Sequence, residues 1–419
     1  MPALARHFAV RPLVGAALLA LGLHGAAAAA TLDYIGQAVL ATGTQYAGTQ
    51  VGGLSGIDYD LATRSYVVIS DDRSQYAPAR FYTLTLDFDR FSRSNAPGAA
   101  GVAFTGVTTL RDASGAAFGP NKVDAESVRL VHGAQGNTTL LWTNEGQRSS
   151  AGFQNPTLRE STLGGEQLRE FTIPAAFLPA GSNGGNAAGD RGIRNNLAFE
   201  SLTLSTDGKS VYIATESALA QDGAIATVNA GSPVRVAQFD YASGQRMAEF
   251  VYQLDAIPVA PVPASGSADN GLVELLAVGD GSFIALERSY AAGVGNSIRL
   301  YLTSTAGATD VAGLSSLAGA SFTSMQKSLL LDLGTLRNDD GSALRLDNVE
   351  GISWGADHEG RKTLLLVSDN NFSGSQFTQF IALGINGELV ATPVPEPASY
   401  ALLLGGLAGL GALARRRRG

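Results

Sequence analysis

Acidic residues recur at similar places along this chain of 419 residues. Five short segments begin with an acid or a small residue and continue as an apolar run. They start at Ser55, Glu126, Glu200, Glu274 and Glu350, so the period is 71 to 76 residues. After each start comes a second apolar run that ends in an acid, and these acids are Asp71, Glu145, Glu216, Glu287 and Asp369. An acid at two fixed points of a repeat predicts a shared position in the fold.

Antiparallel pairing of the two runs places the beginning of the first beside the end of the second. The acids of all repeats therefore meet at one rim if the repeats form a ring. Carboxylates held this close repel one another unless they are protonated, paired or bound to cations, and hard oxygen ligands suit Ca²⁺ or Mg²⁺. The candidate metal ligands are Asp71, Asp72, Glu126, Glu145, Glu200, Glu216, Glu287, Glu350 and Asp369.

Three arginines follow some of these acids, namely Arg73, Arg148 and Arg288. Guanidinium groups match phosphate oxygens in a bidentate way, so these are candidate phosphate ligands. A cation beside them would polarise a phosphoester bond and activate water. The same acids and arginines also suit salt bridges between neighbouring repeats, and an acid before a strand suits a turn. Both interpretations stay open at the level of sequence.

The elements that carry these residues are predicted to be strands. Apolar and polar residues alternate in runs such as 80–86 and 210–215, and helical periodicity is scarce. Third strands are predicted at 81–88, 168–173, 234–241, 298–302 and 377–383, and fourth strands at 102–110, 247–254 and 328–333. Four antiparallel strands in each repeat predict an all-β fold, a single β-propeller.

The last repeat runs out after its third strand. Residues 32–40 read as a strand without a partner, so we expect the N-terminal strand to complete the last blade and close the ring. Five repeats are visible. Because the period is longer than in typical propellers, a sixth blade within the loops stays open.

Both ends of the chain resemble sorting signals. Residues 1–30 have a basic start, a short apolar run and then small residues, the order of a secretory signal peptide. At the other end, residues 394–419 contain Pro395-Glu396-Pro397, an apolar stretch and the arginines 415–418. The apolar stretch is near the lower length limit for a transmembrane helix, and the arginines favour a cytoplasmic end.

This C-terminal order resembles the PEP-CTERM sorting signal of Gram-negative bacteria. The resemblance implies transit through the export machinery, transient anchoring in the inner membrane and cleavage by an exosortase-type protease. Release toward the cell surface or the exopolysaccharide matrix would follow.

Composition narrows the classes of partner and chemistry. The net charge is −8, and because both terminal segments are net positive, the region between them is more acidic still. An acidic surface argues against nucleic acid as a partner. The absence of cysteine excludes disulfides, thiol nucleophiles and thiolate zinc sites. No Gly-x-Ser-x-Gly motif is present, which argues against an α/β-hydrolase.

Residues 31–390, the predicted domain, resemble the phytase-like family described as "esterase-like activity of phytase". The resemblance rests on segments 53–60 and 69–73, Asp124-Ala125-Glu126-Ser127, and segments 195–216, 285–288 and 348–352. It implies a β-propeller in an extracellular protein and hydrolysis of phosphoesters or carboxyesters. It assigns no catalytic residue. Two functions therefore remain: a metal-assisted hydrolase, with Ca²⁺ as the candidate cofactor, or a non-catalytic propeller that binds a matrix polysaccharide or a protein.

Overall fold

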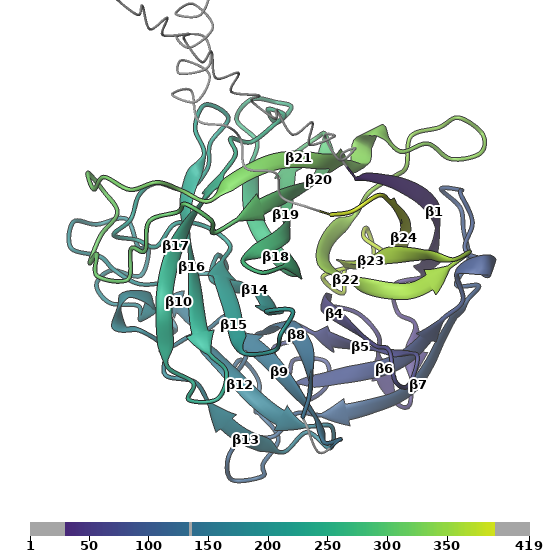
Figure 1. The fold of residues 1–419 in the computed structure, drawn as a ribbon, viewed down its shortest axis with the longest axis horizontal. Helices are drawn as coiled ribbons and strands as arrows, with labels where there is room; N and C mark the ends of the chain where they lie inside the picture. The colour runs from purple at the N-terminus through teal and green to yellow at the C-terminus, as the bar shows by residue number, and fades with distance from the viewer. Residues whose placement is uncertain (1–29, 134–135, 390–419) are drawn as a thin grey trace, which may run out of the picture.

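The computed structural model describes residues 30–133 and 136–389 of the chain. Five four-stranded antiparallel sheets are arranged as blades around a central axis, and the fold is an all-β propeller (Figure 1). Helical structure among the described residues is limited to three 3-10 turns, η1 (Phe88–Arg90), η2 (Ala175–Phe177) and η3 (Leu333–Thr335). None of the described helices is long and apolar enough to cross a membrane. The signal peptide and the C-terminal transmembrane helix predicted from the sequence lie outside the described residues.

Each blade extends from an innermost strand beside the axis to an outermost strand at the surface. In this order, the first blade consists of β4 (Leu54–Asp60), β5 (Ser65–Ser70), β6 (Arg80–Leu86) and β7 (Val102–Thr109). The second consists of β8 (Ala125–His132), β9 (Thr138–Asn144), β12 (Thr157–Thr162) and β13 (Gln167–Glu170). The third consists of β14 (Phe199–Leu204), β15 (Ser210–Thr215), β16 (Ser232–Asp240) and β17 (Arg246–Leu254). The fourth consists of β18 (Ala268–Gly279), β19 (Ser282–Ala291), β20 (Gly295–Ser304) and β21 (Gln326–Asp332). The fifth consists of β22 (Asn348–His358), β23 (Arg361–Asp369), β24 (Thr378–Asn386) and β1 (Thr31–Leu40).

The fifth blade joins the two ends of the chain. The N-terminal strand β1 pairs antiparallel with β24, from Thr31 opposite Asn386 to Leu40 opposite Thr378. This confirms the predicted closure. The pairing covers the edge of β24, which would otherwise expose a row of unpaired backbone groups.

The long period is taken up by loops rather than by a sixth blade. The described residues form five blades, and long connections run from β13 to β14 and from β20 to β21. The connections also contain two short hairpins. One, β2–β3 (Gln45–Tyr46 and Thr49–Gln50), lies between β1 and β4, and the other, β10–β11 (Gln147–Ser149 and Gly152–Gln154), lies between β9 and β12.

The second repeat differs from its prediction. The sequence pattern places its third strand at residues 168–173, but β12 holds that place and β13 is the outermost strand. The sequence does not reveal β12 as a strand, because it contains the charged residue Glu160. Glu160 is buried and forms an ion pair with Arg169 of β13, whose Nε lies 2.7 Å from Glu160 Oε2. A charged residue inside a buried strand breaks the apolar pattern that marks the other strands.

Packing between the blades supplies the core. Five hydrophobic clusters each fill the space between two neighbouring blades, and the cluster around Leu54 and Phe380 joins the first blade to the fifth. Middle strands are covered on both faces by the adjacent blades, so most of their residues are apolar; residues Leu364 to Val367 of β23 have no exposed surface. Burial on both faces therefore holds the ring together.

Each innermost strand carries a β-bulge near its beginning. The ladder to the second strand skips one residue in four blades, at Ser55, Glu200, Val273 and Glu350, and skips Glu126 and Ser127 in the second blade. A bulge leaves its extra residue unpaired and turns that side chain out of the regular alternation. The bulges thus point three glutamates of different blades to the same end of the axis.

The bulges correct the alignment of the fourth repeat. Val273, not Glu274, is equivalent to Glu126, Glu200 and Glu350. Glu274 instead occupies the next position, where the other blades have Gly56, Ser127, Ser201 and Gly351. Small residues are needed there because the inner strands approach closely; a Cβ on Gly56 would lie 2.6 Å from the carbonyl oxygen of Glu126.

Glu274 and Arg129 fill the middle of the ring. Both are buried, with Arg129 Nη2 3.1 Å from Glu274 Oε2. Arg129 donates to the carbonyl oxygens of Ile57, Leu275 and Ile352, at 2.8, 3.0 and 3.1 Å. Glu274 accepts from the Ser127 hydroxyl and from the backbone N–H of Leu202, at 2.5 and 2.8 Å. This axial ion pair is bonded to the innermost strands of all five blades.

Candidate functional site

A polar cleft of about 1100 Å³ opens at the end of the axis where the bulges lie. Its walls come from the loops that follow the second strands and precede the innermost strands. The acids that line it are Asp71, Asp72, Glu126, Glu200, Asp269, Asp347, Glu350 and Asp369. The predicted convergence of acids at one rim is therefore present for most of the candidates.

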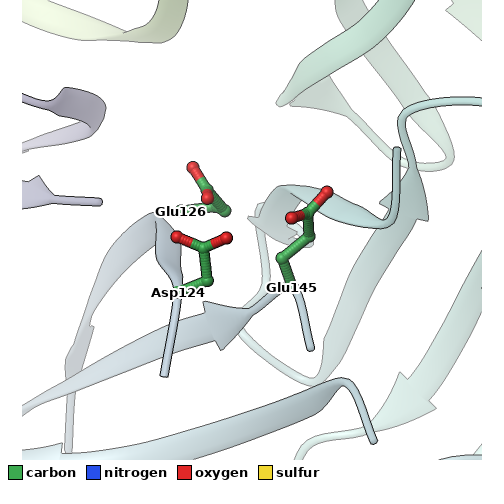
Figure 2. Close-up of side chains that lie close together, drawn as sticks. All are labelled: Asp124, Glu126 and Glu145. Carbon is green, nitrogen blue, oxygen red and sulfur yellow. The ribbon is translucent and has the colours of Figure 1, made fainter. Parts of the chain in front are cut away.

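One half of the site is built around Arg73. Asp124, Glu126 and Glu145 each offer a carboxylate oxygen within 4.8 Å of the others, and all three are buried (Figure 2). Arg73 contacts Asp124 and lies 3.4 Å from Glu145 Oε2. The second oxygen of Glu145 accepts the backbone N–H of Ala198 at 2.9 Å, which anchors this glutamate to the next blade. One arginine thus faces three carboxylates.

The other half is built around Arg288 of β19. Its Nη2 lies 3.1 Å from Glu216 Oε1 and 3.3 Å from Glu350 Oε1, and its Nη1 lies 3.1 Å from Asp269 Oδ1. Glu216 and Glu350 belong to the third and fifth blades, so Arg288 also bridges blades. Its Nε is buried and has no hydrogen-bond partner among the described residues. Arg288 is therefore a salt-bridge partner between blades that also lines the cleft.

Glu200 lies in the cleft between these halves. Its pKa is raised well above the usual value by burial and then by the charges of Glu145 and Glu216. The residue is 8 % exposed, and within the described chain no hydrogen bond or ion pair reaches its carboxylate. A buried carboxylate without a partner is costly, so this side chain needs a proton or a cation supplied from the cleft.

The same electrostatic conflict extends over the whole cluster. Burial raises the pKa of Asp71, Glu126 and Asp369 well above the usual range, and the nearest carboxylates raise these pKa values further. Burial also raises the pKa of Glu145 well above its usual value, and that of Glu216 to about 7 even though Arg288 acts in the opposite direction. Two arginines cannot neutralise this many carboxylates, so the site favours protons or divalent cations.

Three of the predicted metal or phosphate ligands bind other groups of the protein with their charged atoms. Asp72 lines the cleft, but its carboxylate contacts Arg80 and accepts the backbone N–H groups of Gln75, Tyr76 and Ala77. Glu287 accepts from Tyr252, Asn270 and Lys327, outside the cleft lining. These acids hold loops and strands in place.

Arg148, the third of these residues, is absent from the cleft. It is 1 % exposed and donates to the carbonyl oxygens of Ala180, Ser182 and Arg191, at 2.9, 2.8 and 2.7 Å. Its Nη2 also lies 3.3 Å from Asp190 Oδ1. Arg148 fixes the loop before β14 and has no donor left for a phosphate in the cleft.

Sequence reasoning missed several residues in the cleft or next to it. Asp124 precedes its strand by one residue and falls outside the repeat pattern, although it completes the triad with Glu126 and Glu145. Arg345 lines the cleft and stacks over Phe377, with its guanidinium carbon 4.6 Å from the ring centre. Tyr76 lies at the rim, 60 % exposed, stacked on Phe372 with the ring centres 4.4 Å apart. Loop residues such as these carry no periodic signal.

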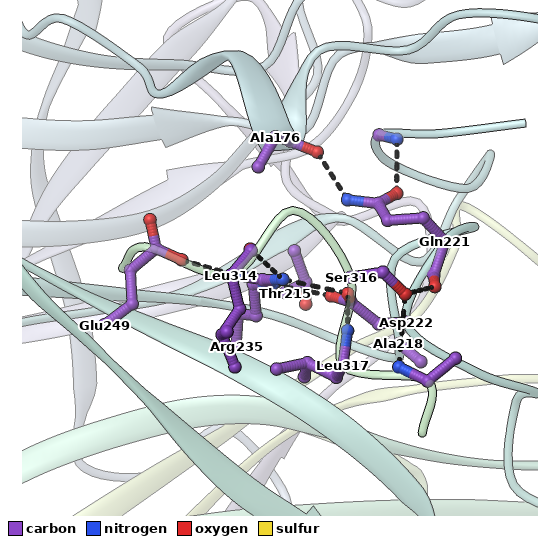
Figure 3. Close-up of polar contacts among 12 residues, drawn as sticks. Ala176, Thr215, Ala218, Gln221, Asp222, Arg235, Glu249, Leu314, Ser316 and Leu317 are labelled. Atoms are coloured by element: carbon purple, nitrogen blue, oxygen red, sulfur yellow. Dashed lines mark hydrogen bonds and ion pairs between the residues drawn. The ribbon is translucent and has the colours of Figure 1, made fainter. Parts of the chain in front are cut away.

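A separate group of buried charges serves the scaffold (Figure 3). Arg235 of β16 is fully buried between Asp222 and Glu249, at 2.6 and 2.7 Å. Asp222 also accepts the backbone N–H of Leu317, and Arg235 donates to the carbonyl oxygen of Leu314. This network attaches the long loop between β20 and β21 to the third blade, and its charges are fully satisfied.

Comparison with known families agrees with this architecture. Residues 49–372 match the phytase-like family, described as esterase-like activity of phytase, and the chain belongs to this family. Residues 393–418 match the PEP-CTERM protein-sorting motif. This motif indicates export with sorting to the cell surface and implies processing by an exosortase. No curated protein matches the chain in sequence.

Three solved structures match much of the chain at low sequence identity. An endo-arabinase from Bacteroides thetaiotaomicron VPI-5482 is 11% identical with a TM-score of 0.42, covering 82% of this chain and 96% of its own. The Dos1 propeller is 7% identical with a TM-score of 0.33, covering 81% and 69%. U3-55K is 7% identical with a TM-score of 0.35, covering 83% and 99%.

Proposed function

We propose that this protein is an exported, cation-assisted hydrolase of phosphoesters or carboxyesters, and that the acidic cleft is its active site. The observation that carries the proposal is the gathering of buried carboxylates from several blades around Arg73 and Arg288. Family membership supports it. The sorting motif supports a route through transient membrane anchoring to the cell surface or the matrix.

The donor set fits a hard divalent cation such as Ca²⁺, because every ligand candidate is a carboxylate oxygen. The triad of Asp124, Glu126 and Glu145 is the most compact part of it. A cation held by these three residues would supply a Lewis acid for the ester bond.

The remaining roles belong to side chains of the chain itself. Arg288 and Arg73 hold the anionic group of the substrate, since guanidinium donors match phosphate oxygens. Glu200 lines the cleft without a partner, and burial raises its pKa well above the usual value, so its carboxyl is suited to donate a proton to the leaving group of an ester.

A calcium titration followed by thermal melting tests the proposal. We expect calcium to raise the Tm of the domain and a chelator to reverse the rise, because binding to the folded state alone stabilises it. Glu200→Gln reduces both this rise and the hydrolysis of p-nitrophenyl phosphate or p-nitrophenyl acetate. The matched control is Glu170→Gln, which removes an exposed glutamate of the outermost strand β13.

A second candidate function is a non-catalytic propeller that binds a matrix polysaccharide or a protein partner. The observation that favours it is the large cleft with the exposed Tyr76 at its rim, since aromatic faces contact sugar rings well. If chelation leaves the wild-type Tm unchanged and neither ester is hydrolysed with calcium present, this second function replaces the first.

A further inference from the structure

The cleft is closed toward the far end of the axis. Below its acidic floor, the axial ion pair of Arg129 and Glu274 crosses the middle of the ring and is bonded to all five innermost strands. A ligand therefore does not pass through the ring, and it reaches the cleft at the end of the axis where Glu126, Glu200 and Glu350 lie. The direction in which this end points decides what reaches the site.

The described part of the chain ends on the opposite face. The connection from β23 to β24 lies at the cleft, because Asp369 ends β23 there and Ser375 and Gln376 belong to the lining. From Thr378, β24 runs away from the cleft and ends at Asn386. The first residue of β1, Thr31, pairs with Asn386, so both ends of the domain leave from the far face.

The segment between the domain and the apolar C-terminal stretch is short. Leu389 still packs against the core between the fourth and fifth blades. Residues 390–397 then precede the apolar stretch that begins at Ala398. Fully extended, they reach about 30 Å at most. Because β24 has nine residues, the blade is itself about 30 Å long. Residues 390–397 would therefore need their whole extended length to reach back to the cleft face.

We propose that, while the C-terminal sorting segment holds this protein in a bilayer, the far face of the propeller is directed toward the lipid and the cleft opens away from it. The membrane-held form and the released form then offer the same access to the cleft. Ligands in the surrounding medium, including large ones, can therefore bind in the cleft before the protease releases the domain. This inference does not depend on whether the cleft is catalytic.

Energy transfer from the protein to the membrane tests the orientation. The chain has no cysteine, so single labelling sites are clean. Asp357→Cys places a donor dye near the end of β22 on the far face, and Ser375→Cys places it at the cleft. Both residues are exposed and belong to the same blade. The full chain with its C-terminal segment is reconstituted into phosphatidylcholine vesicles that carry an acceptor-labelled lipid.

We expect transfer from position 357 to exceed transfer from position 375 by severalfold. We also expect a soluble maleimide to react with the Ser375→Cys variant at the same rate in vesicles as in detergent. A chain that ends at Leu389 is the control and transfers energy from neither position. Equal transfer, stronger transfer from position 375, or no transfer from the full chain at either position overturns the proposal. Because no step requires turnover, failure of the proposed hydrolase function gives a different result from failure of this one.

Discussion

The pKa shifts of the buried carboxylates around Arg288 and Arg73 connect the stability of the protein to pH. Burial raises the pKa of Glu216 to about 7 in the folded protein from an ordinary value of 4.5. Between these values the folded state keeps a proton that the unfolded state releases, so stability is greatest at the acidic end and falls as the pH rises through 7. In chelator, we therefore expect Tm to decrease from about pH 5 to about pH 8. Calcium reduces this decrease, and a Tm that rises over the same range contradicts the assignment.

Arg288 allows a second test at the residue scale. Arg288→Ala leaves Glu216 and Glu350 without their cation, which costs about 3 kcal/mol in a buried setting. We expect a lower Tm without calcium, a larger calcium-induced rise, and inorganic phosphate binding weakened about tenfold. Isothermal titration with phosphate and thermal melts measure the two effects. Unchanged phosphate binding would remove Arg288 from the anion site and leave it as a bridge between blades.

The arginines also show how far single residues are predictable. Arg73 and Arg288 both line the cleft, because Arg73 closely follows the second strand β5 and Arg288 lies near the end of the second strand β19. Arg148 and Glu287 stand near equivalent positions, yet their charges are used by carbonyl oxygens of a loop and by Lys327. Nothing local in the sequence distinguishes these cases, since the partners of Arg148 lie more than thirty residues further along the chain.

At the scale of elements, the period predicts the blades but not their register. The bulges decide which residue of each innermost strand faces the cleft, and they appear only when the ladder is known. Glu274 looks like a rim acid from its spacing, whereas the bulge at Val273 moves it into the axis. The charged strand β12 and the isolated Asp124 escape prediction for a related reason, because their tertiary partners override the local pattern.

The closing strand gives a test at this scale. A chain that begins after Leu40 lacks β1, so the edge of β24 is exposed and buried side chains such as Ala38 and Leu40 are lost. We expect this chain to aggregate, because an open apolar edge pairs with other chains. A synthetic peptide of residues 31–40 added during refolding restores monomeric protein, as measured by size-exclusion chromatography. Soluble, monomeric protein without the peptide would show that closure is dispensable.

Arg148→Met tests the loop before β14 separately from the cleft. Loss of the guanidinium removes the ion pair to Asp190 and leaves the carbonyl oxygens of Ala180, Ser182 and Arg191 without this donor, which destabilises the loop. We expect earlier urea unfolding and faster proteolysis between residues 180 and 193, with calcium binding unchanged in the folded fraction. Loss of calcium or phosphate binding at temperatures where the variant is folded would place Arg148 back in the site.

For the whole molecule, the axial ion pair couples the blades. Its bonds reach all five innermost strands, while each hydrophobic cluster joins only two neighbours. Blades that meet at one buried ion pair do not separate independently without breaking it. We therefore expect one cooperative unfolding transition, reported alike by Trp142 of the second blade and Trp354 of the fifth.

Breaking the pair from one side leaves a buried charge without a partner, so Arg129→Met or Glu274→Leu alone destabilises the protein by about 3–5 kcal/mol. The double variant Arg129→Met/Glu274→Leu removes both charges, and its cost is expected to be smaller than the sum of the two single costs. Urea unfolding followed by tryptophan fluorescence measures all three. Additive costs would mean that the two side chains act independently, and single variants as stable as the wild type would mean that hydrophobic packing between neighbours suffices to hold the ring.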